Sequence, residues 1–513
     1  MVRDIIEQLQ AGQDIRKNLI ELKAECKEYT GKNAVLYALN NKLDLLYSFL
    51  HMDDPKIRKN AALILGQLGV EDSLELLYEA YVREDTLFVK SSYLTAMREL
   101  DYRKHLEDFK KRLQELQQTP VEDKNKKHVA EEKKILQDMI LTLEGHKKHT
   151  FIGWKEPSNV ILLTNRNFRE VTEEQLKNSR PRLFTAGVQA KCEDLKEMYE
   201  IRTFSELLFV LADCPTLQVD GQATIDKLAQ SLASQLGASS LLHFLKVRHQ
   251  GKEPFYFRIE CKNKMDLKQK STFTKKLAAY LQEETGNSLI NSTSHYEVEL
   301  RLVENKVGNF NLMIKLFTYK DPRFQYRREA MSSSIQPVNA ALAMKLAQKY
   351  IKEDAQVLDP FCGVGTMLIE RNYAGRTGDM YGIDIFGKGI EAARRNTENA
   401  KMHINYINRD FFDFHHAYLF DEVISNMPRV MGKKTTKDIY EIYINFWKKI
   451  QEHIGEDAVL VLYCYDREIL LDTIPKNRFA IQDEFEISKK EGAYLYVIQQ
   501  KLCNHVSQSK YKY

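Results

Sequence analysis

The 513-residue sequence is poor in cysteine, glycine and proline, and it contains no long apolar run. Eleven prolines and 22 glycines are too few for a long disordered or collagen-like chain. The seven cysteines include no Cys-x-x-Cys pair, which argues against a disulfide framework and against a cysteine metal site. They are Cys26, Cys192, Cys214, Cys261, Cys362, Cys464 and Cys503. Isolated thiols, a charged N-terminus and no run of roughly 18 apolar residues predict a cytoplasmic protein without a signal peptide or membrane span.

The sequence also lacks a large excess of charge of one sign, with 76 Lys and Arg against 72 Asp and Glu. This excludes a uniformly basic coat but leaves room for a basic face. Residues 251–330 hold 15 Lys and Arg against 10 Asp and Glu, so the positive balance is concentrated there. A phosphate-binding face needs such a concentration. The candidate RNA-binding lysines of this segment are Lys262, Lys264, Lys268, Lys270, Lys275 and Lys276.

At roughly 100–200 residues per domain, the length suggests about three domains. Residues 1–148 show helical apolar spacing throughout, with a polar break at Thr119–Lys127. An echo at an offset of 32 residues pairs Ile57 with Val89 and Leu65 with Met97. The first copy, opened by Asp-Pro, resembles a HEAT repeat, which implies an all-α domain with a surface for a protein partner. An irregular helical bundle is the alternative.

The pattern changes near residue 149 and again near residue 338. Residues 149–320 alternate strand-like runs, at 159–164, 255–261, 295–303 and 311–317, with helical stretches, which predicts an α+β block. Residues 321–337 form a linker. From 338 to 513, strands and helices alternate regularly and end in a predicted hairpin. That pattern indicates an α/β domain whose parallel sheet has an antiparallel edge.

The most informative motif is VLDPFCGVGTMLIE at 357–370. A buried strand ends at Asp359, and a loop with Gly363 and Gly365 leads into a helix, as at the ligand-binding edge of open α/β sheets. A nicotinamide-dinucleotide fingerprint would have a third glycine at the position of Leu368. A phosphate-binding P-loop would continue Gly-Lys-Ser/Thr, whereas this loop reads Gly-Thr-Met. Neither nucleotide interpretation fits.

Asp-Pro-Phe-Cys-Gly-x-Gly-Thr resembles the class I S-adenosylmethionine-dependent methyltransferases, specifically their RNA-modifying branch. The resemblance implies a Rossmann-like fold and S-adenosylmethionine as cofactor. Asp384 ends the next strand and corresponds to the acid that takes both ribose hydroxyls. Asp410 and Phe411 follow the third strand and correspond to the adenine contacts. The implied cofactor-binding residues are Asp359, Phe361, Gly363, Gly365, Thr366, Asp384, Asp410 and Phe411.

After the fourth strand the sequence reads Ser-Asn-Met-Pro-Arg, residues 425–429. In the amino-methylating members, Asn- or Asp-Pro-Pro followed by an aromatic accepts hydrogen bonds from the target amine. The resemblance therefore implies Asn426, Ser425 and Pro428 as catalytic residues. Met427 and Arg429 depart from that pattern, and Asn-Met-Pro also resembles the Asn-Leu-Pro of transfer-RNA guanine N1 methyltransferases. Arg429 could stack on a base in place of the aromatic.

The segment from Phe255 to Val303 resembles a THUMP domain in its order of strand, basic segment, helix and strand. THUMP modules grip the acceptor end of transfer RNA, so the resemblance implies that substrate class. A small ferredoxin-like domain would precede it. The linker resembles the segment that closes the cofactor pocket in THUMP-methyltransferases, so Tyr326, Arg327 and Arg328 are expected at the groove between modules.

Together these features predict a multidomain RNA methyltransferase with a HEAT-like region, a ferredoxin-like/THUMP region and a Rossmann-like methyltransferase domain. The expected reaction is methyl transfer to guanine N2 in the acceptor stem of transfer RNA. Ribosomal-RNA guanine methylation, transfer-RNA guanine N1 methylation and a catalytically decayed RNA-binding scaffold remain as alternatives. No metal is expected.

Overall fold

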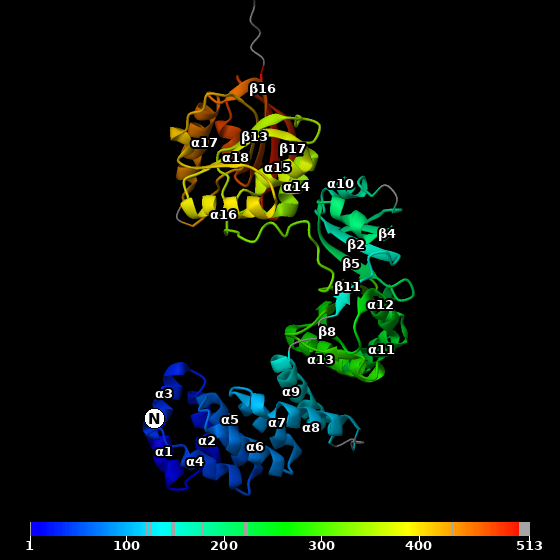
Figure 1. Ribbon diagram of the computed structural model, residues 1–513, viewed down its shortest axis with the longest axis vertical. Helices are drawn as coiled ribbons and strands as arrows, with labels where there is room; N and C mark the ends of the chain where they lie inside the picture. The colour runs from blue at the N-terminus through cyan, green and yellow to red at the C-terminus, as the bar shows by residue number, and fades with distance from the viewer. Residues whose placement is uncertain are drawn as a thin grey trace, which may run out of the picture. The chain divides into compact units, whose positions relative to one another are not determined.

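The computed structural model describes residues 2–118, 122, 125–144, 149–176, 179–219, 221, 224–432 and 434–501. The chain divides into two compact units, residues 1–147 and 148–513 (Figure 1). Within the described residues, no helix is both long enough and apolar enough to cross a bilayer. Six of the cysteines are buried free thiols, and Cys503 lies outside the described residues.

The described part of the first unit is helical, as its apolar spacing predicts. Its elements are α1 (Val2–Gln10), α2 (Ile15–Glu25), α3 (Tyr29–Ala38), α4 (Asp44–Ser48), η1 (Phe49–His51), α5 (Pro55–Leu68), α6 (Ser73–Arg83), α7 (Leu87–Met97), η2 (Tyr102–His105), α8 (Leu106–Gln118) and α9 (Lys126–Glu144). The polar break predicted at Thr119–Lys127 lies mostly outside the described residues. Helix α5 starts as its Asp-Pro predicts, because the Asp54 carboxylate accepts a hydrogen bond from the Lys56 backbone N–H.

The two helices related by the sequence echo, α5 and α7, pack side by side, with α2 next to α5 and α9 next to α7. Their crossing depends on a small residue. A Cβ added to Gly66 would lie 2.5 Å from the Ala96 Cα, so the backbones meet with no room for a side chain. This row of neighbouring helices is compatible with HEAT-like stacking, which stays a prediction.

In the described part of residues 149–320, nine strands form one sheet, so the α+β prediction is confirmed. Their order is β3-β4-β2-β5-β11-β10-β8-β9, and β6 pairs with β11. The bounds are β2 (Ser158–Thr164), β3 (Arg182–Phe184), β4 (Gly187–Cys192), β5 (Phe204–Val210), β6 (Thr216–Leu217), β8 (Phe255–Lys262), β9 (Leu289–Asn291), β10 (Val298–Glu304) and β11 (Phe310–Leu316). A short antiparallel pair, β1 (Thr150–Phe151) and β7 (His249–Gln250), lies outside this sheet.

The two faces of this sheet differ. One face buries apolar side chains such as Leu300 and Leu302 with Phe273 and Leu277 of α13 (Leu267–Glu284). The other helical elements of the region are α10 (Arg169–Glu173), η3 (Leu195–Glu200), α11 (Ile225–Ala238) and α12 (Leu241–Arg248).

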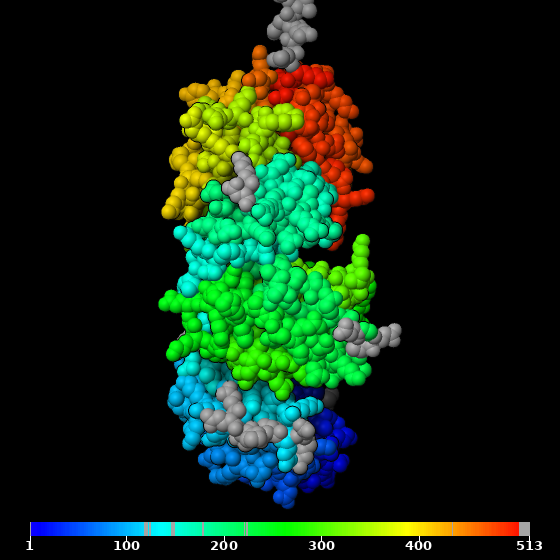
Figure 2. Space-filling view, turned by 90° about the vertical axis from the view of Figure 1, so that its right-hand side faces the viewer, coloured from blue at the N-terminus to red at the C-terminus, as the bar shows by residue number. Residues whose placement is uncertain are grey.

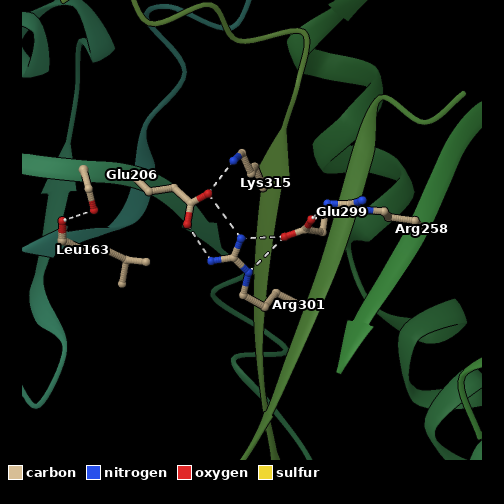
Figure 3. A network of polar contacts seen from close by, with 7 residues as sticks. Leu163, Glu206, Arg258, Glu299, Arg301 and Lys315 are labelled. Atoms are coloured by element: carbon tan, nitrogen blue, oxygen red, sulfur yellow. Dashed lines mark hydrogen bonds and ion pairs between the residues drawn. The ribbon is translucent and has the colours of Figure 1, made fainter. Parts of the chain in front are cut away.

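The opposite face carries a ladder of ion pairs across β5, β11, β10 and β8 (Figure 3). Arg301 donates to Glu206 and to Glu299, each at 2.6 Å. Lys315 pairs with Glu206, and Arg258 pairs with Glu299. The ladder ties the two halves of the sheet together.

A second sheet contains seven strands among the described residues, in the order β14-β13-β12-β15-β16-β18-β17. They are β12 (Ala355–Asp359), β13 (Thr377–Asp384), β14 (Asn405–Asn408), β15 (Phe420–Asn426), β16 (Ile454–Cys464), β17 (Phe479–Ser488) and β18 (Ala493–Gln500). The first five run parallel, and β17 and β18 form the predicted antiparallel edge. The helices are α14 (Pro337–Leu346), α15 (Thr366–Ala374), α16 (Gly387–Asn399), η4 (Phe411–Asp413), α17 (Thr436–Ile450) and α18 (Arg467–Thr473).

The close approach of α5 and α7 gives a test of the first unit. Gly66→Val should destabilise that unit by about 1–3 kcal/mol, because the added methyl groups must push the two helices apart. Calorimetric unfolding of the full chain measures the effect. Lys56→Ala, at an exposed position of the same helix, is the matched control and should leave the transition within about 0.5 kcal/mol. A Gly66→Val protein that unfolds like the control would contradict the helix crossing.

Candidate active site

A cavity of about 550 Å³ opens at the carboxyl ends of the central parallel strands. The strand order reverses there, between β12 and β15, which is where open α/β sheets bind ligands. The predicted site residues that line it are Asp359, Phe361, Gly363, Thr366, Asp384, Asp410, Phe411, Asn426, Pro428 and Arg429. The structure therefore brings together residues that four separate strand ends supply.

Two glycines shape the loop between β12 and α15. Gly363 has a φ of 51° and Gly365 a φ of 81°, a region that favours glycine. A Cβ on Gly365 would lie 2.3 Å from the Tyr406 hydroxyl oxygen, so no side chain fits there. A Cβ on Gly363 would meet Met331 Cε at 3.7 Å, an ordinary van der Waals contact. Gly365 thus supports the loop from behind, whereas Gly363 presents backbone to the cavity.

Asp384, at the end of β13, is held by two backbone N–H groups. Gly363 donates to one carboxylate oxygen at 2.9 Å, and Phe386 donates to the other at 2.8 Å. A carboxylate offers about four lone-pair positions. Each oxygen therefore keeps an acceptor position, which suits a pair of neighbouring hydroxyl groups such as those of a ribose.

The wall beyond β14 combines an exposed acid with buried aromatic rings. Asp410 is exposed and accepts a hydrogen bond from the Phe412 backbone N–H at 3.0 Å. Phe411 is 1% exposed, and its ring centroid lies 6.1 Å from that of Phe361. An acceptor beside an apolar wall suits a base such as adenine, which has a flat apolar face and a donor amine.

The two central strands are joined beneath the cavity by a buried hydrogen bond. The Ser425 hydroxyl donates to the Asp359 carboxylate at 2.6 Å, and the Phe361 backbone N–H donates to the same oxygen at 3.1 Å. Burial raises the pKa of Asp359 to about 7, and the Ser425 hydrogen bond only partly offsets this. Ser425, predicted as catalytic, is fully buried behind the lining residues, so in this structure it contacts Asp359 rather than the cavity.

Asn426 has its amide in a defined orientation. Its Nδ2 donates to the Ser333 carbonyl at 3.3 Å. Its Oδ1 is buried and has no hydrogen-bond partner among the described residues. The Thr366 hydroxyl oxygen is likewise buried without a partner in that part of the chain. Such orphaned acceptors are costly unless a ligand satisfies them.

The residues that follow Asn426 turn the chain along the cavity. Met427 is 1% exposed, and its N–H donates to the Tyr463 carbonyl at 2.8 Å. Pro428 and Arg429 face the cavity. The Arg429 guanidinium carbon lies 4.1 Å from the centroid of the Tyr465 ring, so the cation stacks on an aromatic ring at the cavity wall.

The linker was expected to close the pocket, and residues 331–335 of it, here called the strap, form one wall of the cavity, although none of them was named as a site residue. Asn396, fully buried on α16, ties the chain just before this strap to the loop between β12 and α15. Its side chain accepts hydrogen bonds from the N–H groups of Arg328 and Glu329, each at 3.2 Å, and donates to the Val364 carbonyl at 3.2 Å. The linker motif pointed to this neighbourhood but a few residues too early.

Other lining residues that were not predicted from the sequence include Ile385 and Phe386, which are 68% and 49% exposed. The sequence signal for them was an apolar pair directly after Asp384, because large apolar side chains that stay exposed often mark a binding site.

The remaining predicted residues lie outside the cavity. Arg327 donates to the Gln336 side chain at 3.2 Å, and Arg328 is exposed. Lys262, Lys264, Lys268 and Lys275 are exposed, and Lys270 is half-buried. Lys276 forms an ion pair with Asp226, and Lys264 lies 3.6 Å from Glu304. These lysines belong to β8, α13 and the turn between them, so they form a surface group apart from the cavity.

Residues 325–491 match the family model described as the RMKL-like methyltransferase domain. The match contains the strap and every residue that lines the cavity. This part of the chain is therefore a class I methyltransferase domain, and its cofactor is S-adenosylmethionine.

Curated relatives match the chain in part. The tRNA (guanine(6)-N2)-methyltransferase of Methanocaldococcus jannaschii is 27% identical over 196 residues, covering 29% of this chain and 50% of that protein. The ribosomal protein L11 methyltransferase of Dictyoglomus turgidum is 25% identical over 162 residues, covering 31% of this chain and 48% of that protein. The chain thus spans about half the length of the curated relatives it matches.

Solved structures share the fold over a longer stretch. TrmN from Thermus thermophilus matches with a TM-score of 0.50 at 14% identity, covering 67% of this chain and 99% of that chain. SMU.472 in complex with SAH (S-adenosylhomocysteine) matches with a TM-score of 0.50 at 15% identity, covering 68% of this chain and 100% of that chain. Because residues 325–491 are only a third of the chain, the shared fold extends beyond the methyltransferase domain.

The Asp384 geometry predicts a loss of cofactor affinity. Asp384→Ala should weaken S-adenosylmethionine binding by about tenfold or more, because charge-assisted hydrogen bonds contribute roughly 1.5–3 kcal/mol. Isothermal titration calorimetry measures it. Asp379→Ala, at an exposed position of the same strand outside the cavity, should bind like the unaltered protein. Equal affinities for the two variants would remove Asp384 from the cofactor site.

The raised pKa of Asp359 predicts a pH dependence of binding. A cation in the cavity favours the ionised carboxylate, so affinity for the sulfonium S-adenosylmethionine should rise as the pH passes about 7 and level off above it. S-adenosylhomocysteine lacks the sulfonium charge and is the matched ligand control, with a shallower dependence. Calorimetric titrations from pH 6 to pH 8.5 measure both. Parallel curves for the two ligands would show that Asp359 does not sense the charge.

Proposed function

We propose that this chain transfers a methyl group from S-adenosylmethionine to the exocyclic amine N2 of a guanine in transfer RNA. The methyltransferase domain supports the reaction type. The substrate class is supported by the partial similarity to a relative named tRNA (guanine(6)-N2)-methyltransferase. The acceptor stem is the proposed location because the sequence of residues 255–303 resembles a THUMP domain, and in the structure this segment runs through β8, α13, β9 and into β10.

The orientation of the Asn426 amide is the observation that favours a target nitrogen bearing hydrogen. One N–H of its Nδ2 donates to the Ser333 carbonyl, which fixes the amide so that the partnerless Oδ1 is the acceptor offered to a ligand. An acceptor in that position selects a nucleophile that carries hydrogen, as an exocyclic amine does. The hydrogen bond would aim the nitrogen lone pair toward the methyl donor, and such positioning can account for most of the acceleration. Pro428 would hold the turn, and Ser425 would support it through Asp359.

The side chains that line the cavity suit the chemical groups of S-adenosylmethionine. S-adenosylmethionine supplies an electrophilic methyl group on a sulfonium. Asp384 would hold the ribose hydroxyls, and Asp410 with Phe411 and Phe361 would hold the adenine. Gly363 would let backbone approach the ligand, and the unpaired Thr366 hydroxyl would gain a partner. Asp359 would balance the positive charge.

RNA would be held away from the cavity as well as beside it. Lys262, Lys268, Lys270 and Lys275 form no ion pair among the described residues, so their charges are available to phosphates. Lys264 and Lys276 would contribute less, because acids already neutralise them. Beside the cavity, Arg429 would offer a base a flat cation that already stacks on Tyr465. Arg327 and Arg328, which precede the strap, would add positive charge to the linker. The helical first unit would serve as a HEAT-like surface for a protein partner.

Guanine N1 is the second candidate atom, and it is favoured by the Asn-Met-Pro sequence at 426–428. N1 of guanine also carries a hydrogen, so Asn426 Oδ1 can serve either target. Transfer of labelled methyl groups to transfer RNA and ribosomal RNA that lack the modification, followed by nucleoside analysis, separates the candidates. N2-methylguanosine in transfer RNA supports the proposal, and N1-methylguanosine or label in ribosomal RNA replaces it. Cofactor binding without any labelled RNA indicates a decayed, RNA-binding scaffold.

Substitution of Asn426 tests the acceptor directly. Asn426→Ala should lower kcat by about 100-fold, the scale of losing one positioned polar group, with S-adenosylmethionine affinity within about twofold. Asn426→Asp keeps an acceptor oxygen and should retain more activity than the alanine variant. Asn372→Ala removes an amide of the same domain that lies outside the cavity and should leave kcat unchanged. A wild-type rate for Asn426→Ala would place the catalytic position elsewhere.

A further inference from the structure

The two sheets of the second unit meet at a joint of buried, charged side chains. Glu370 on α15 is 1% exposed and accepts hydrogen bonds from Arg202 Nε and Nη2, both at 2.8 Å. The Tyr326 hydroxyl donates to the same carboxylate at 2.7 Å. Arg202 lies in the loop before β5 of the first sheet, and Tyr326 belongs to the linker between the sheets. Three parts of the chain therefore converge on one carboxylate. Figure 2 shows the cyan-to-green residues of the first sheet next to the yellow-to-red methyltransferase domain.

The orientation of Arg202 is restrained on every side. Its guanidinium lies 3.9 Å from the ring centroid of Tyr373 and 4.9 Å from that of Phe324. Nη2 also donates to the Arg323 carbonyl at 2.8 Å. A guanidinium that binds a carboxylate through two nitrogens fixes rotation as well as distance. A lysine at this position would keep the charge and lose that geometry.

The linker is itself fastened to the first sheet through Arg323. Its buried guanidinium donates to the carbonyl groups of Ile201 and Phe204, at 2.6 and 3.1 Å, and pairs with Asp321. The guanidinium carbon stacks 3.4 Å from the Phe204 ring centroid. The linker thus follows the first sheet up to Arg323 and reaches the methyltransferase domain at Tyr326.

A second point of attachment lies on β17. The side-chain amides of Asn165 and Asn167 donate to the carbonyl groups of Ile487 and Glu486, at 2.8 and 2.9 Å. Phe168 packs edge-on against Phe485, with ring centroids 5.8 Å apart. These contacts are neutral, whereas the Arg202–Glu370 contact is a buried ion pair. Two points of attachment define an angle between the sheets that one point leaves free.

The joint touches both elements that shape the cavity. Helix α15 begins at Thr366 in the cavity wall, and Glu370 lies about one turn further along it. The chain from Tyr326 continues into the strap, whose Ser333 carbonyl holds the Asn426 amide. The Glu370 carboxylate therefore helps to position the first sheet, through Arg202, and Asn426, through Tyr326 and the strap.

We propose that Arg202 is a positioning residue for methyl transfer, which holds the RNA-binding sheet at a fixed distance and angle from Asn426. Through Glu370 it selects which nucleotide of a bound RNA reaches the cavity. This inference rests on the RNA methylation proposed above and assigns the choice of nucleotide to an ion pair outside the active site.

The test replaces Arg202 and maps the methylated nucleotide. Arg202→Gln should bind S-adenosylmethionine and transfer RNA within about twofold of the unaltered protein, lower kcat about 10-fold or more, and spread methylation to neighbouring nucleotides. Arg202→Lys should do the same, because it keeps the charge without the two-nitrogen contact. An unchanged kcat with methylation at one unchanged nucleotide overturns the proposal.

Arg301→Gln is the matched control. Arg301 also bridges two glutamates in the same sheet and is partly buried, but its contacts stay within that sheet (Figure 3). Its loss should lower the unfolding temperature while leaving kcat and the methylated nucleotide as they were. If Arg301→Gln reproduces the scatter of methylated positions, the effect is general destabilisation and the proposal is overturned.

A distance measurement separates this inference from the proposed function. Spin labels at Lys191 and Glu398, exposed positions on β4 and α16, report the separation of the two sheets in the full chain. Arg202→Gln should broaden the distance distribution, and Arg301→Gln should not. A distribution as narrow as that of the unaltered protein overturns the joint, whether or not any RNA is methylated. Absence of methylation by the unaltered protein, with broadening in Arg202→Gln, overturns only the proposed reaction.

Discussion

The site depends on one buried hydrogen bond, from the Ser425 hydroxyl to the Asp359 carboxylate. It joins the two central strands, β12 and β15, at the point where the strand order reverses. After Asp359, the loop with Gly363 is hydrogen-bonded to Asp384. After Ser425, the next residue, Asn426, lines the cavity. Because the carboxyl group is buried, an unsatisfied oxygen there would be costly. The hydroxyl therefore keeps both halves of the site in register.

The orientation of one amide links this geometry to the chemistry. Asn426 donates one N–H to the strap, and its acceptor oxygen has no partner among the described residues, so the chain itself determines which way the amide faces. The strap is in turn anchored beside the cofactor loop by Asn396, whose polar atoms are all paired within the protein. The strap is thus hydrogen-bonded to Asn426, and the residues just before it are tied to the loop after β12.

Much of the fold and of the cavity lining could be predicted from sequence, because those features are local. A strand that ends in Asp359, followed by glycines and a helix, requires only neighbouring residues. Ser425 was expected at the active site because it belongs to the Ser-Asn-Met-Pro-Arg motif, but adjacent side chains of a strand point to opposite faces. The Arg202–Glu370 pair joins residues 168 positions apart, so no spacing rule could reveal it. The ion pair of Lys276 with Asp226 depends on how α13 packs against α11 and was equally invisible.

The order of strands in the first sheet also has a consequence for how the protein is made. β11 is the last strand of that region in sequence, yet it lies between β5 and β10 in space. Until the ribosome has synthesised residues 310–316, β5 has an unpaired edge, and β10 lacks its antiparallel neighbour. Open strand edges invite wrong partners. The region is therefore most exposed to misassembly during translation of the roughly hundred residues between β5 and β11, a stretch in which chaperone binding would have its largest effect.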